Sequence, residues 1–429
     1  MQREMLKSIV VEQAQRNYLP DDAIRREAEA RLQDWRETPF IVCVTGLRRA
    51  GKSTLVHQLL DGGHQPVYFL NFDDERLMSF DTSDFQMLNE VFYELYGEEG
   101  VYFFDEIQNV EGWECFVRRL HEAGRKVYVT GSNASMLSSE FGTRLTGRHL
   151  QLELFPFSFR EYVDYKRVPA APDALHTTAG RARIRSAFMQ YLTEGGIPEF
   201  ISTGKEYFLQ SLYDNIIYRD IISGHLIRKE RQFKELVHYL MSNCGKEHSH
   251  NALRKLVGLS NAGTIKEYIA CLSGSYLLES VNQFEPSLIQ QMKAPKKVYS
   301  IDCALARHVS FAFSENMGRQ VENVVYLHLR RTGHEIYHHH GDGNCDFLAV
   351  DRGKVAAAIQ VCADMESRET RARELRGLRD AMREYGLRRG VIVTLDDEEQ
   401  VKEGRSTVEI VPIWKWLWNQ SGGAENLLP

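Results

Sequence analysis

The stretch Phe40 to Leu60, FIVCVTGLRRAGKSTLVHQLL, constrains the fold of this chain more than any other. It begins with a continuous apolar, β-rich run, continues with the spacing GxxxxGK[ST], and ends in an apolar pattern of helical period. A continuous apolar strand is typical of a parallel sheet covered on both faces. The stretch therefore predicts an α/β domain with a phosphate-binding loop between a buried strand and a helix.

Each part of this loop has a mechanical role in binding a nucleotide. Glycines let backbone N–H groups curl around phosphate oxygens, the Lys52 ammonium reaches the β- and γ-phosphates, and the Ser53 hydroxyl binds Mg²⁺. We therefore expect ATP and Mg²⁺ as ligands. The expected contacts of the loop are Gly46, Leu47, Arg48, Arg49, Ala50, Gly51, Lys52, Ser53 and Thr54.

A second apolar run, Val101 to Phe104, leads directly into Asp105 and Glu106. A carboxylate at the carboxyl end of a strand next to the loop is well placed to hold Mg²⁺ through water, and the following one to polarise the attacking water. The pair predicts a metal-holding Asp105 and a catalytic Glu106. A strand that simply ends in a turn is the alternative, and the loop upstream disfavours it.

A third strand, in KVYVTGSNASML, is followed at once by Ser132 and Asn133, where a polar side chain would sense the γ-phosphate. Both residue types also begin helices well. Further on, Arg144 and Arg148 lie on a polar stretch before another expected strand. Either is a candidate for an arginine that reaches a neighbouring subunit's nucleotide, with Arg148 favoured, and either can equally be a plain surface arginine.

Several motifs together resemble one family. The stretches GLRRAGKST, FFDEIQ, VTGSNASML, RLTGRHLQLELFPFSFREY and YLTEGGIPEF are similar to those of AAA-type ATPases of bacteria and archaea that carry a C-terminal domain of unknown function. The resemblance runs from about Pro39 to about Trp418. It implies an α/β AAA core, a helical lid, a winged helix-turn-helix and a C-terminal α/β domain like a restriction endonuclease. It implies no particular substrate.

The expected domains follow from this resemblance and from breaks in the pattern. They are a helical segment at 1–37, the ATPase core at 38–155, the lid at 156–224, the winged-helix segment at 225–290, the nuclease-like domain at 291–420 and a tail at 421–429.

The winged-helix segment is the candidate for contact with DNA. The whole chain has a net charge of −6, but residues 229–300 hold ten Lys or Arg and six Glu. A local basic surface of this kind suits a phosphate backbone. Packing against another protein is the alternative, because the third helix is only weakly basic. The candidate contacts are Thr264, Lys266, Lys293, Lys296 and Lys297.

The C-terminal domain raises the question of a second active site. The layout of a restriction-endonuclease-like site would place Glu322 on a helix, Asp346 on a strand and an ExK motif on the next strand. In such a site carboxylates hold Mg²⁺ and the lysine offsets developing charge. This chain has Gln360 and Cys362 in the ExK positions. The sequence therefore predicts a degenerate site with nuclease activity disfavoured.

Composition excludes several other classes. No apolar run approaches the ~20 residues that a membrane span needs, and the N-terminus lacks the pattern of a signal peptide, so we expect a cytoplasmic protein without a membrane partner. The seven cysteines are scattered without a CxxC pair, which indicates neither a disulfide framework nor a zinc site.

The expectation is thus an ATP-hydrolysing, Mg²⁺-dependent AAA-type ATPase, assembled as a homo-oligomer, that couples hydrolysis to DNA binding or remodelling. A nucleotide-driven switch that binds another protein is the first alternative, favoured by the acidic overall charge. An ATP-gated nuclease is the second.

Overall fold

The computed structural model describes the chain except for residues 17, 133–146, 171–173, 311–316 and 420–429. The chain divides into two compact units, Met1–Phe155 with Gly274–Tyr276, and Pro156–Ser273 with Leu277–Pro429. Among the described residues, no helix combines the length and the apolar character that spanning a membrane requires.

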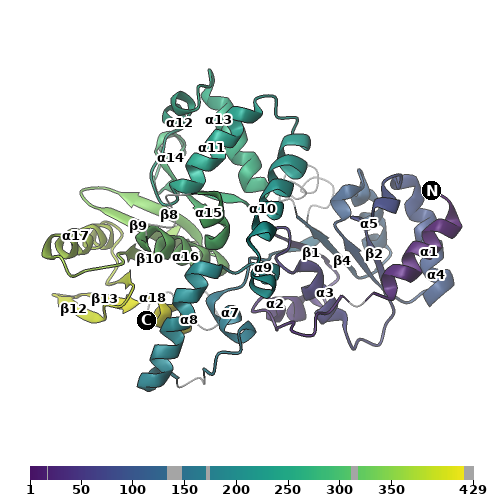
Figure 1. The fold of residues 1–429 in the computed structure, drawn as a ribbon, viewed down its shortest axis with the longest axis horizontal. Coiled ribbons are helices and arrows are strands. Elements are labelled where there is room, and N and C mark those ends of the chain that lie inside the picture. The colour runs from purple at the N-terminus through teal and green to yellow at the C-terminus, as the bar shows by residue number, and fades with distance from the viewer. Residues whose placement is uncertain (17, 133–146, 171–173, 311–316, 420–429) are drawn as a thin grey trace. The chain divides into compact units, whose positions relative to one another are not determined.

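The first unit is a five-stranded sheet covered by helices on both faces (Figure 1). All its strand pairs are parallel, in the order β2-β3-β4-β1-β5. Its elements are α1 (Arg3–Ala14), α2 (Glu29–Trp35), β1 (Ile41–Thr45), α3 (Lys52–Leu60), β2 (Val67–Asn71), α4 (Phe85–Tyr96), β3 (Val101–Asp105), α5 (Trp113–Glu122), β4 (Val127–Gly131) and β5 (His149–Glu153).

The two faces of this sheet carry separate hydrophobic clusters because strand side chains alternate. Cys43 and Phe104 point into one cluster, with α1, α4 and α5. Val44 and Phe103 point into the other, with α2 and α3. Strands buried on both sides account for the continuous apolar runs in the sequence, and the predicted α/β parallel-sheet core is confirmed.

The second unit begins with helices and ends in a mixed eight-stranded sheet. The helical part comprises α7 (Phe159–Tyr165), α8 (Thr178–Glu194), α9 (Pro198–Thr203), α10 (Glu206–Asp214), a π-helix η6 (Asn215–Ser223), α11 (Glu230–Ser242), α12 (His250–Leu256) and α13 (Ala262–Gly274). The remaining elements are β6 (Leu278–Gln283), α14 (Leu288–Lys293), β7 (Lys296–Ser300), α15 (Cys303–Val309), α16 (Met317–Arg331), β8 (Glu335–His340), β9 (Asn344–Asp351), β10 (Lys354–Val361), α17 (Arg368–Glu384), β11 (Arg389–Thr394), β12 (Glu399–Glu403), β13 (Ser406–Pro412) and α18 (Ile413–Asn419).

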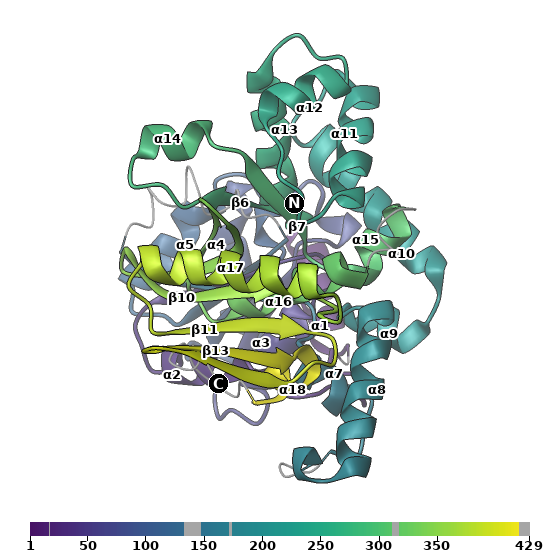
Figure 2. The same cartoon turned by 90° about the vertical axis from the view of Figure 1, so that its left-hand side faces the viewer.

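The order of this second sheet is β12-β13-β11-β10-β9-β8-β6-β7. The amphipathic helix α17 lies along β10 and β11 and packs its apolar side on them (Figure 2). On α16, Tyr326 stacks on Tyr299 of β7, with ring centroids 4.4 Å apart. The sheet runs across residue 290, where the sequence suggests a domain boundary, because β6 and β7 pair with each other and β6 also pairs with β8.

The family-specific GGIPEF stretch is anchored within the second unit. The Asp302 carboxylate, at the start of α15, accepts hydrogen bonds from the backbone N–H of Gly196 at 2.6 Å and of Leu305 at 3.0 Å. A Cβ on Gly195 would lie 2.3 Å from the Asp302 carboxylate, and one on Gly196 would lie 2.4 Å from the carbonyl oxygen of Phe157. The two glycines are therefore required by close backbone approach.

Candidate nucleotide site and buried ion triad

The loop between β1 and α3 has the backbone shape that its glycines predict. Gly46 and Gly51 adopt φ of 141° and 94°, and a Cβ on Gly46 would lie 2.1 Å from the carbonyl oxygen of Leu154. Leu47 and Ala50 are buried and Arg49 has φ of 66°. The loop thus follows a path that side chains at the two glycines would prevent.

Lys52 begins α3 and its side chain is buried. Its Nζ donates to the carbonyl oxygens of Gly46 at 3.2 Å and of Leu47 at 3.1 Å, and lies 3.5 Å from Glu106 Oε1. The ammonium is therefore held mainly by neutral acceptors of the loop. Such an ammonium can move to phosphate oxygens without breaking a close, hydrogen-bonded contact with a carboxylate.

Ser53 and Asp105 are brought together as the sequence predicts. The Ser53 hydroxyl lies 2.8 Å from each carboxylate oxygen of Asp105, and Thr130 Oγ1 also donates to this carboxylate. Burial, together with the neighbouring Glu106 carboxylate, raises the pKa of Asp105 to about 6. A hydroxyl and a carboxylate side by side form a donor set that fits Mg²⁺, which prefers hard oxygen ligands.

Glu106 follows directly after β3 in a left-handed conformation, with φ of 50°. Its Oε2 accepts hydrogen bonds from Ser132 at 2.9 Å and from the side chain of Gln108. Burial favours the neutral acid, but the nearby Lys52 ammonium and these hydrogen bonds outweigh it and lower the pKa of Glu106. Glu106 is thus an oriented and ionised carboxylate.

Three side chains of this site were not predicted. Thr130 holds Asp105 by its hydroxyl and also accepts the backbone N–H of Glu106 at 3.1 Å. Gln108 holds Glu106. Arg26 donates to the carbonyl oxygen of Ala50 at 2.8 Å from a segment that carries no motif. Only Thr130, at the end of the third predicted strand, had a signal in the sequence.

The structure describes some of the remaining predicted site residues but not all of them. Arg148 carries an exposed side chain whose Nη1 lies 3.0 Å from Glu122 Oε1. Arg48 lies 3.6 Å from Asp73 Oδ2. Arg144 and Asn133 lie outside the described residues. The proposed roles of these side chains stay predictions.

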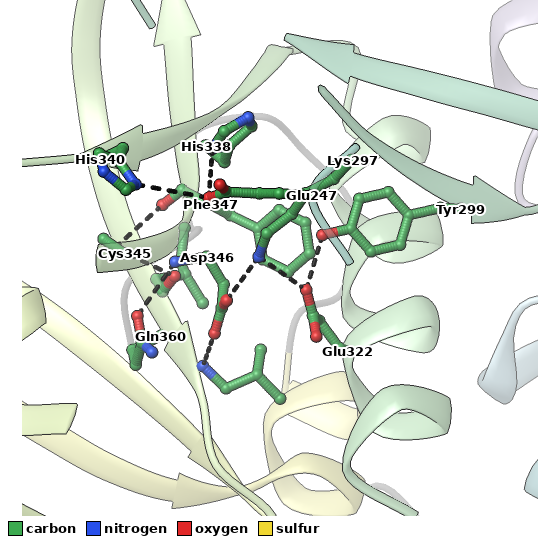
Figure 3. Close-up of polar contacts among 12 residues, drawn as sticks. Glu247, Lys297, Tyr299, Glu322, His338, His340, Cys345, Asp346, Phe347 and Gln360 are labelled. Atoms are coloured by element: carbon green, nitrogen blue, oxygen red, sulfur yellow. Dashed lines mark hydrogen bonds and ion pairs between the residues drawn. The ribbon is translucent and has the colours of Figure 1, made fainter. Parts of the chain in front are cut away.

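In the second unit, Glu322 on α16 and Asp346 on β9 meet around a third charged group (Figure 3). Lys297 Nζ, from β7, lies 2.7 Å from Asp346 Oδ1 and 3.1 Å from Glu322 Oε1. The Tyr299 hydroxyl donates to Glu322 Oε1 at 2.7 Å, and the backbone N–H of Val361 donates to Asp346 Oδ2 at 3.1 Å. We call Lys297, Glu322 and Asp346 the ion triad.

Burial dominates the electrostatics of the ion triad. It raises the pKa of Glu322 to about 7, against the opposing effect of the Lys297 ammonium, and Asp346 adds to the rise. For Lys297, burial favours the neutral amine, but the Asp346 and Glu322 carboxylates outweigh it and raise the pKa of the ammonium. Lys297 is therefore a fixed positive charge at neutral pH.

The placement of Lys297 differs from the exposed position that the sequence suggested. The sequence assigned it to an exposed basic run that contacts nucleic acid, but its side chain is only 8% exposed and is committed to the ion triad. Neighbouring residues of a strand point to opposite faces, so Lys297 shares a face with Tyr299, and Lys296 instead bonds Asn282. The site also holds a cation, contrary to the expectation that Cys362 left it without one.

The two ExK positions lie apart from the triad carboxylates. Gln360 Oε1 accepts the backbone N–H of Asp346 at 3.0 Å, and its Nε2 donates to Glu374 Oε2 at 2.6 Å. Cys362 belongs to the apolar cluster under α17, and its thiol donates to the carbonyl oxygen of Asp364. Gln360 therefore fixes the backbone of Asp346, while Cys362 is a packing residue.

Three family models match the chain. An AAA domain matches residues 38–163, a domain of unknown function (DUF8612) matches residues 185–316, and a restriction endonuclease domain matches residues 313–401. An uncharacterized protein of Methanocaldococcus jannaschii is 30% identical over 88% of this chain and 88% of its own length. One of Haemophilus influenzae is 28% identical over 71% of this chain and 78% of its own.

Solved structures show more distant likenesses. The Walker-type ATPase of Pyrococcus abyssi is 17% identical, covers 68% of this chain and 97% of its own, and has a TM-score of 0.41. The ORC1 protein of Aeropyrum pernix, solved in complex with DNA, is 16% identical, covers 73% and 96%, and has a TM-score of 0.29. At these scores the likenesses carry no argument about what this chain binds.

Fold and matches define the class, a P-loop protein with an AAA-type ATPase domain followed by a restriction-endonuclease-like domain. The chain belongs to the family of AAA-domain proteins that includes the Methanocaldococcus jannaschii relative. The predicted family resemblance is thereby confirmed for these two domains.

Proposed function

We propose that the first unit hydrolyses ATP with Mg²⁺ and that the protein couples this hydrolysis to contact with DNA. The observation that carries the proposal is the pairing of Ser53 with Asp105 beside the oriented carboxylate of Glu106. A nucleotide-binding loop alone needs neither pair, whereas phosphoryl transfer to water needs both a metal ligand set and a group that positions water.

The roles of the residues follow from their contacts. Lys52 exchanges the carbonyl oxygens of its own loop for phosphate oxygens of ATP. Ser53 and Asp105 would hold Mg²⁺, which would offset the negative charge of the phosphates. Glu106 accepts a proton from water while the water oxygen bonds to the γ-phosphorus. The bond from this phosphorus to the bridging oxygen breaks, which yields ADP and phosphate.

Glu106 is kept ready for this role by its neighbours. Ser132 and Gln108 fix the carboxylate from one side, and the Lys52 ammonium favours its ionised form. When Lys52 moves from its place 3.5 Å from Glu106 Oε1 to the phosphates, this oxygen becomes available to water while Oε2 stays hydrogen-bonded. We assign Ser132 to sensing the γ-phosphate through Glu106.

The DNA-contacting part of the proposal rests on the segment from α11 to β7. Three helices are followed by the antiparallel hairpin β6–β7, and His248 pairs with Lys296 in an isolated β-bridge. This order supports the proposed winged helix. Lys266 and Lys293 are exposed, as phosphate contacts must be, and Thr264 is partly exposed.

A second candidate, a nucleotide-driven switch that binds another protein, is favoured by α14. This short helix exposes Leu288, Ile289 and Met292 at 76%, 66% and 67%. Adjacent exposed apolar side chains suit a protein partner better than a phosphate backbone. The helix lies between β6 and β7, where a wing would contact DNA.

The test is ATP turnover by the full chain, alone and with duplex DNA, single-stranded DNA or RNA. Lys52→Ala and Glu106→Gln serve as controls for contaminating enzymes. Stimulation by DNA that weakens steeply with salt supports the coupling. Turnover that depends on Lys52 but ignores all nucleic acids favours the protein-binding switch, and turnover indifferent to Lys52 overturns the proposal.

The proposal includes assembly into a homo-oligomer, with Arg148 of one subunit reaching the nucleotide of the next. Its guanidinium is exposed and paired with an exposed Glu122, an ion pair that contributes little and is readily exchanged. Arg148→Ala should then lower turnover in a way that depends on protein concentration, whereas Glu122→Ala should not.

A further inference from the structure

The cation of the ion triad comes from a strand where the restriction-endonuclease-like layout does not predict one. Lys297 lies on β7, outside the residues 313–401 that match the restriction endonuclease model, whereas Glu322 and Asp346 lie inside them. All three side chains are mostly buried but retain 10%, 13% and 16% exposure. Each side chain thus keeps a small part of its surface in contact with solvent.

A purely structural role explains the ion triad poorly. Two carboxyl groups share one ammonium at a buried site where desolvation is costly. Apolar side chains of similar size would pack such a position at lower free energy. Buried ionisable groups with shifted pKa values cluster at sites that bind a ligand or react.

We propose that Lys297 supplies the cation of a phosphodiester-hydrolysing site whose carboxylates are Glu322 and Asp346, in place of the lysine that Cys362 replaces. The substrate class is the sugar–phosphate backbone of a nucleic acid. Gln360 acts as a positioning residue, because it holds the backbone of Asp346 and is itself held by Glu374.

A restriction-endonuclease-like fold implies a divalent cation, and the triad carboxylates fit one. Among the described side chains there is no group of three or more His, Cys, Asp or Glu arranged to hold a metal ion. Mg²⁺, however, keeps several waters and is bound by one or two carboxylates plus substrate phosphates. Gly245 lets the Glu322 carboxylate pack closely, since a Cβ there would lie 2.7 Å from Glu322 Oε2.

In this site Glu322 and Asp346 would hold the divalent cation, which would offset the charge of the phosphate. Lys297 stabilises the negative charge that builds up on the phosphate oxygens during attack. One water is consumed, since its oxygen bonds to phosphorus while the bond from phosphorus to the leaving sugar oxygen breaks. One water proton ends on that sugar oxygen, and the other leaves from the new phosphate group.

The first readout is metal binding by the full chain, measured as Mn²⁺ titrated calorimetrically into the nucleotide-free protein. Because Ser53 and Asp105 form another metal site, the titration is carried out on the Asp105→Asn background. Asp346→Asn should weaken the remaining Mn²⁺ binding at least tenfold. Lys297→Met should not weaken it, because the ammonium competes with the metal for the same carboxylates.

The second readout is cleavage of supercoiled DNA, linear duplex, single strand and RNA, with Mn²⁺ or Mg²⁺, with and without ATP. We expect cleavage that Asp346→Asn abolishes and that Lys297→Met slows at least a hundredfold. Lys402→Met, an exposed lysine on β12 of the same sheet, is the matched control and should change neither readout. ATP-independent cleavage keeps this result separate from any failure of the ATPase proposal.

Lys297→Arg covers the case in which Lys297→Met does not fold, since it keeps the charge and should slow cleavage at least tenfold with Mn²⁺ binding intact. Three results overturn the proposal. These are Mn²⁺ binding that is indifferent to Asp346, cleavage that survives both Lys297 variants, and Mn²⁺ binding without cleavage of any of the four substrates.

Discussion

The nucleotide site and the ion triad are built from the same three groups, a buried lysine and two carboxylates, held in different ways. Lys52 rests mainly on backbone carbonyls and lies 3.5 Å from Glu106, while hydroxyls hold Asp105. Lys297 instead contacts both of its carboxylates directly. The first lysine can move to an arriving phosphate, whereas the second leaves two carboxylates without their ammonium if it moves.

The largest expected effect tests whether the two sites act independently. Glu106→Gln should lower ATP turnover at least a hundredfold, the range for loss of a general base, while a fluorescent ATP analogue still binds. Asp346→Asn should leave turnover within a factor of two, because all the side chains proposed to act in hydrolysis belong to the AAA domain. Phosphate release measures turnover in both variants. An equal loss of turnover in the two would show that the two sites do not act independently.

The second prediction compares stability. Lys297→Met should destabilise the second unit by about 3 kcal/mol, because it leaves two buried carboxylates without their ammonium. Lys52→Met should cost about 1 kcal/mol, because it removes hydrogen bonds to loop carbonyls. Denaturant unfolding monitors both, with Lys402→Met as the neutral reference, and a smaller cost for Lys297→Met than for Lys52→Met would contradict the contrast.

The third prediction concerns acid and the helix that carries Lys52. His57 of α3 stacks on Tyr18 at 4.6 Å, and burial lowers its pKa to about 4, below its ordinary value of 6.5. Its contribution to stability is present above pH 6.5 and is lost as the pH falls toward 4. The free energy of unfolding should fall by about 2 kcal/mol from pH 7 to pH 5 because of this group.

His57→Phe should remove this acid sensitivity from the first unit. The variant and the wild type are unfolded by denaturant at pH 7 and pH 5. An unchanged difference between the two pH values in the variant would show that another group is responsible.

The smallest effect comes from Asp105, whose pKa is raised to about 6 from the ordinary 3.8. A raised pKa means that its stabilising contribution is present below pH 4 and is lost as the pH rises through 6. The free energy of unfolding of Asp105→Asn, relative to that of the wild type, should therefore rise by on the order of 1 kcal/mol from pH 5 to pH 8. Unfolding curves at both pH values measure this difference. A stability advantage of the variant at pH 5 alone would contradict the prediction.

The nucleotide site was predictable because its parts are contiguous motifs at strand ends, where parallel strands bring them to one edge. Ser53 lies in the first turn of α3, Asp105 ends β3 and Glu106 follows it directly, and the sequence marks both elements clearly. Gln108 was missed because its role depends on the left-handed turn at Glu106. No pattern in the sequence marks such a turn at a residue other than glycine.

The ion triad was predicted only in part, because its cation lies 25 residues before Glu322 and 49 before Asp346. Charge counting grouped Lys297 with Lys293 and Lys296 as one basic run. The signal that separates them is the alternation of the strand Lys296–Ser300, which puts Lys297 in phase with the buried Tyr299. That signal has meaning only once the strand is known to join the C-terminal sheet.

The position of β7 also bears on how such a site can be inherited. Lys297 belongs to the matched segment 185–316 and both carboxylates belong to the matched segment 313–401. Recombination between relatives that exchanged either segment alone would separate the ammonium from its carboxylates unless the incoming segment carried a matching charge. A hybrid chain that keeps the triad must therefore take both segments from the same parent.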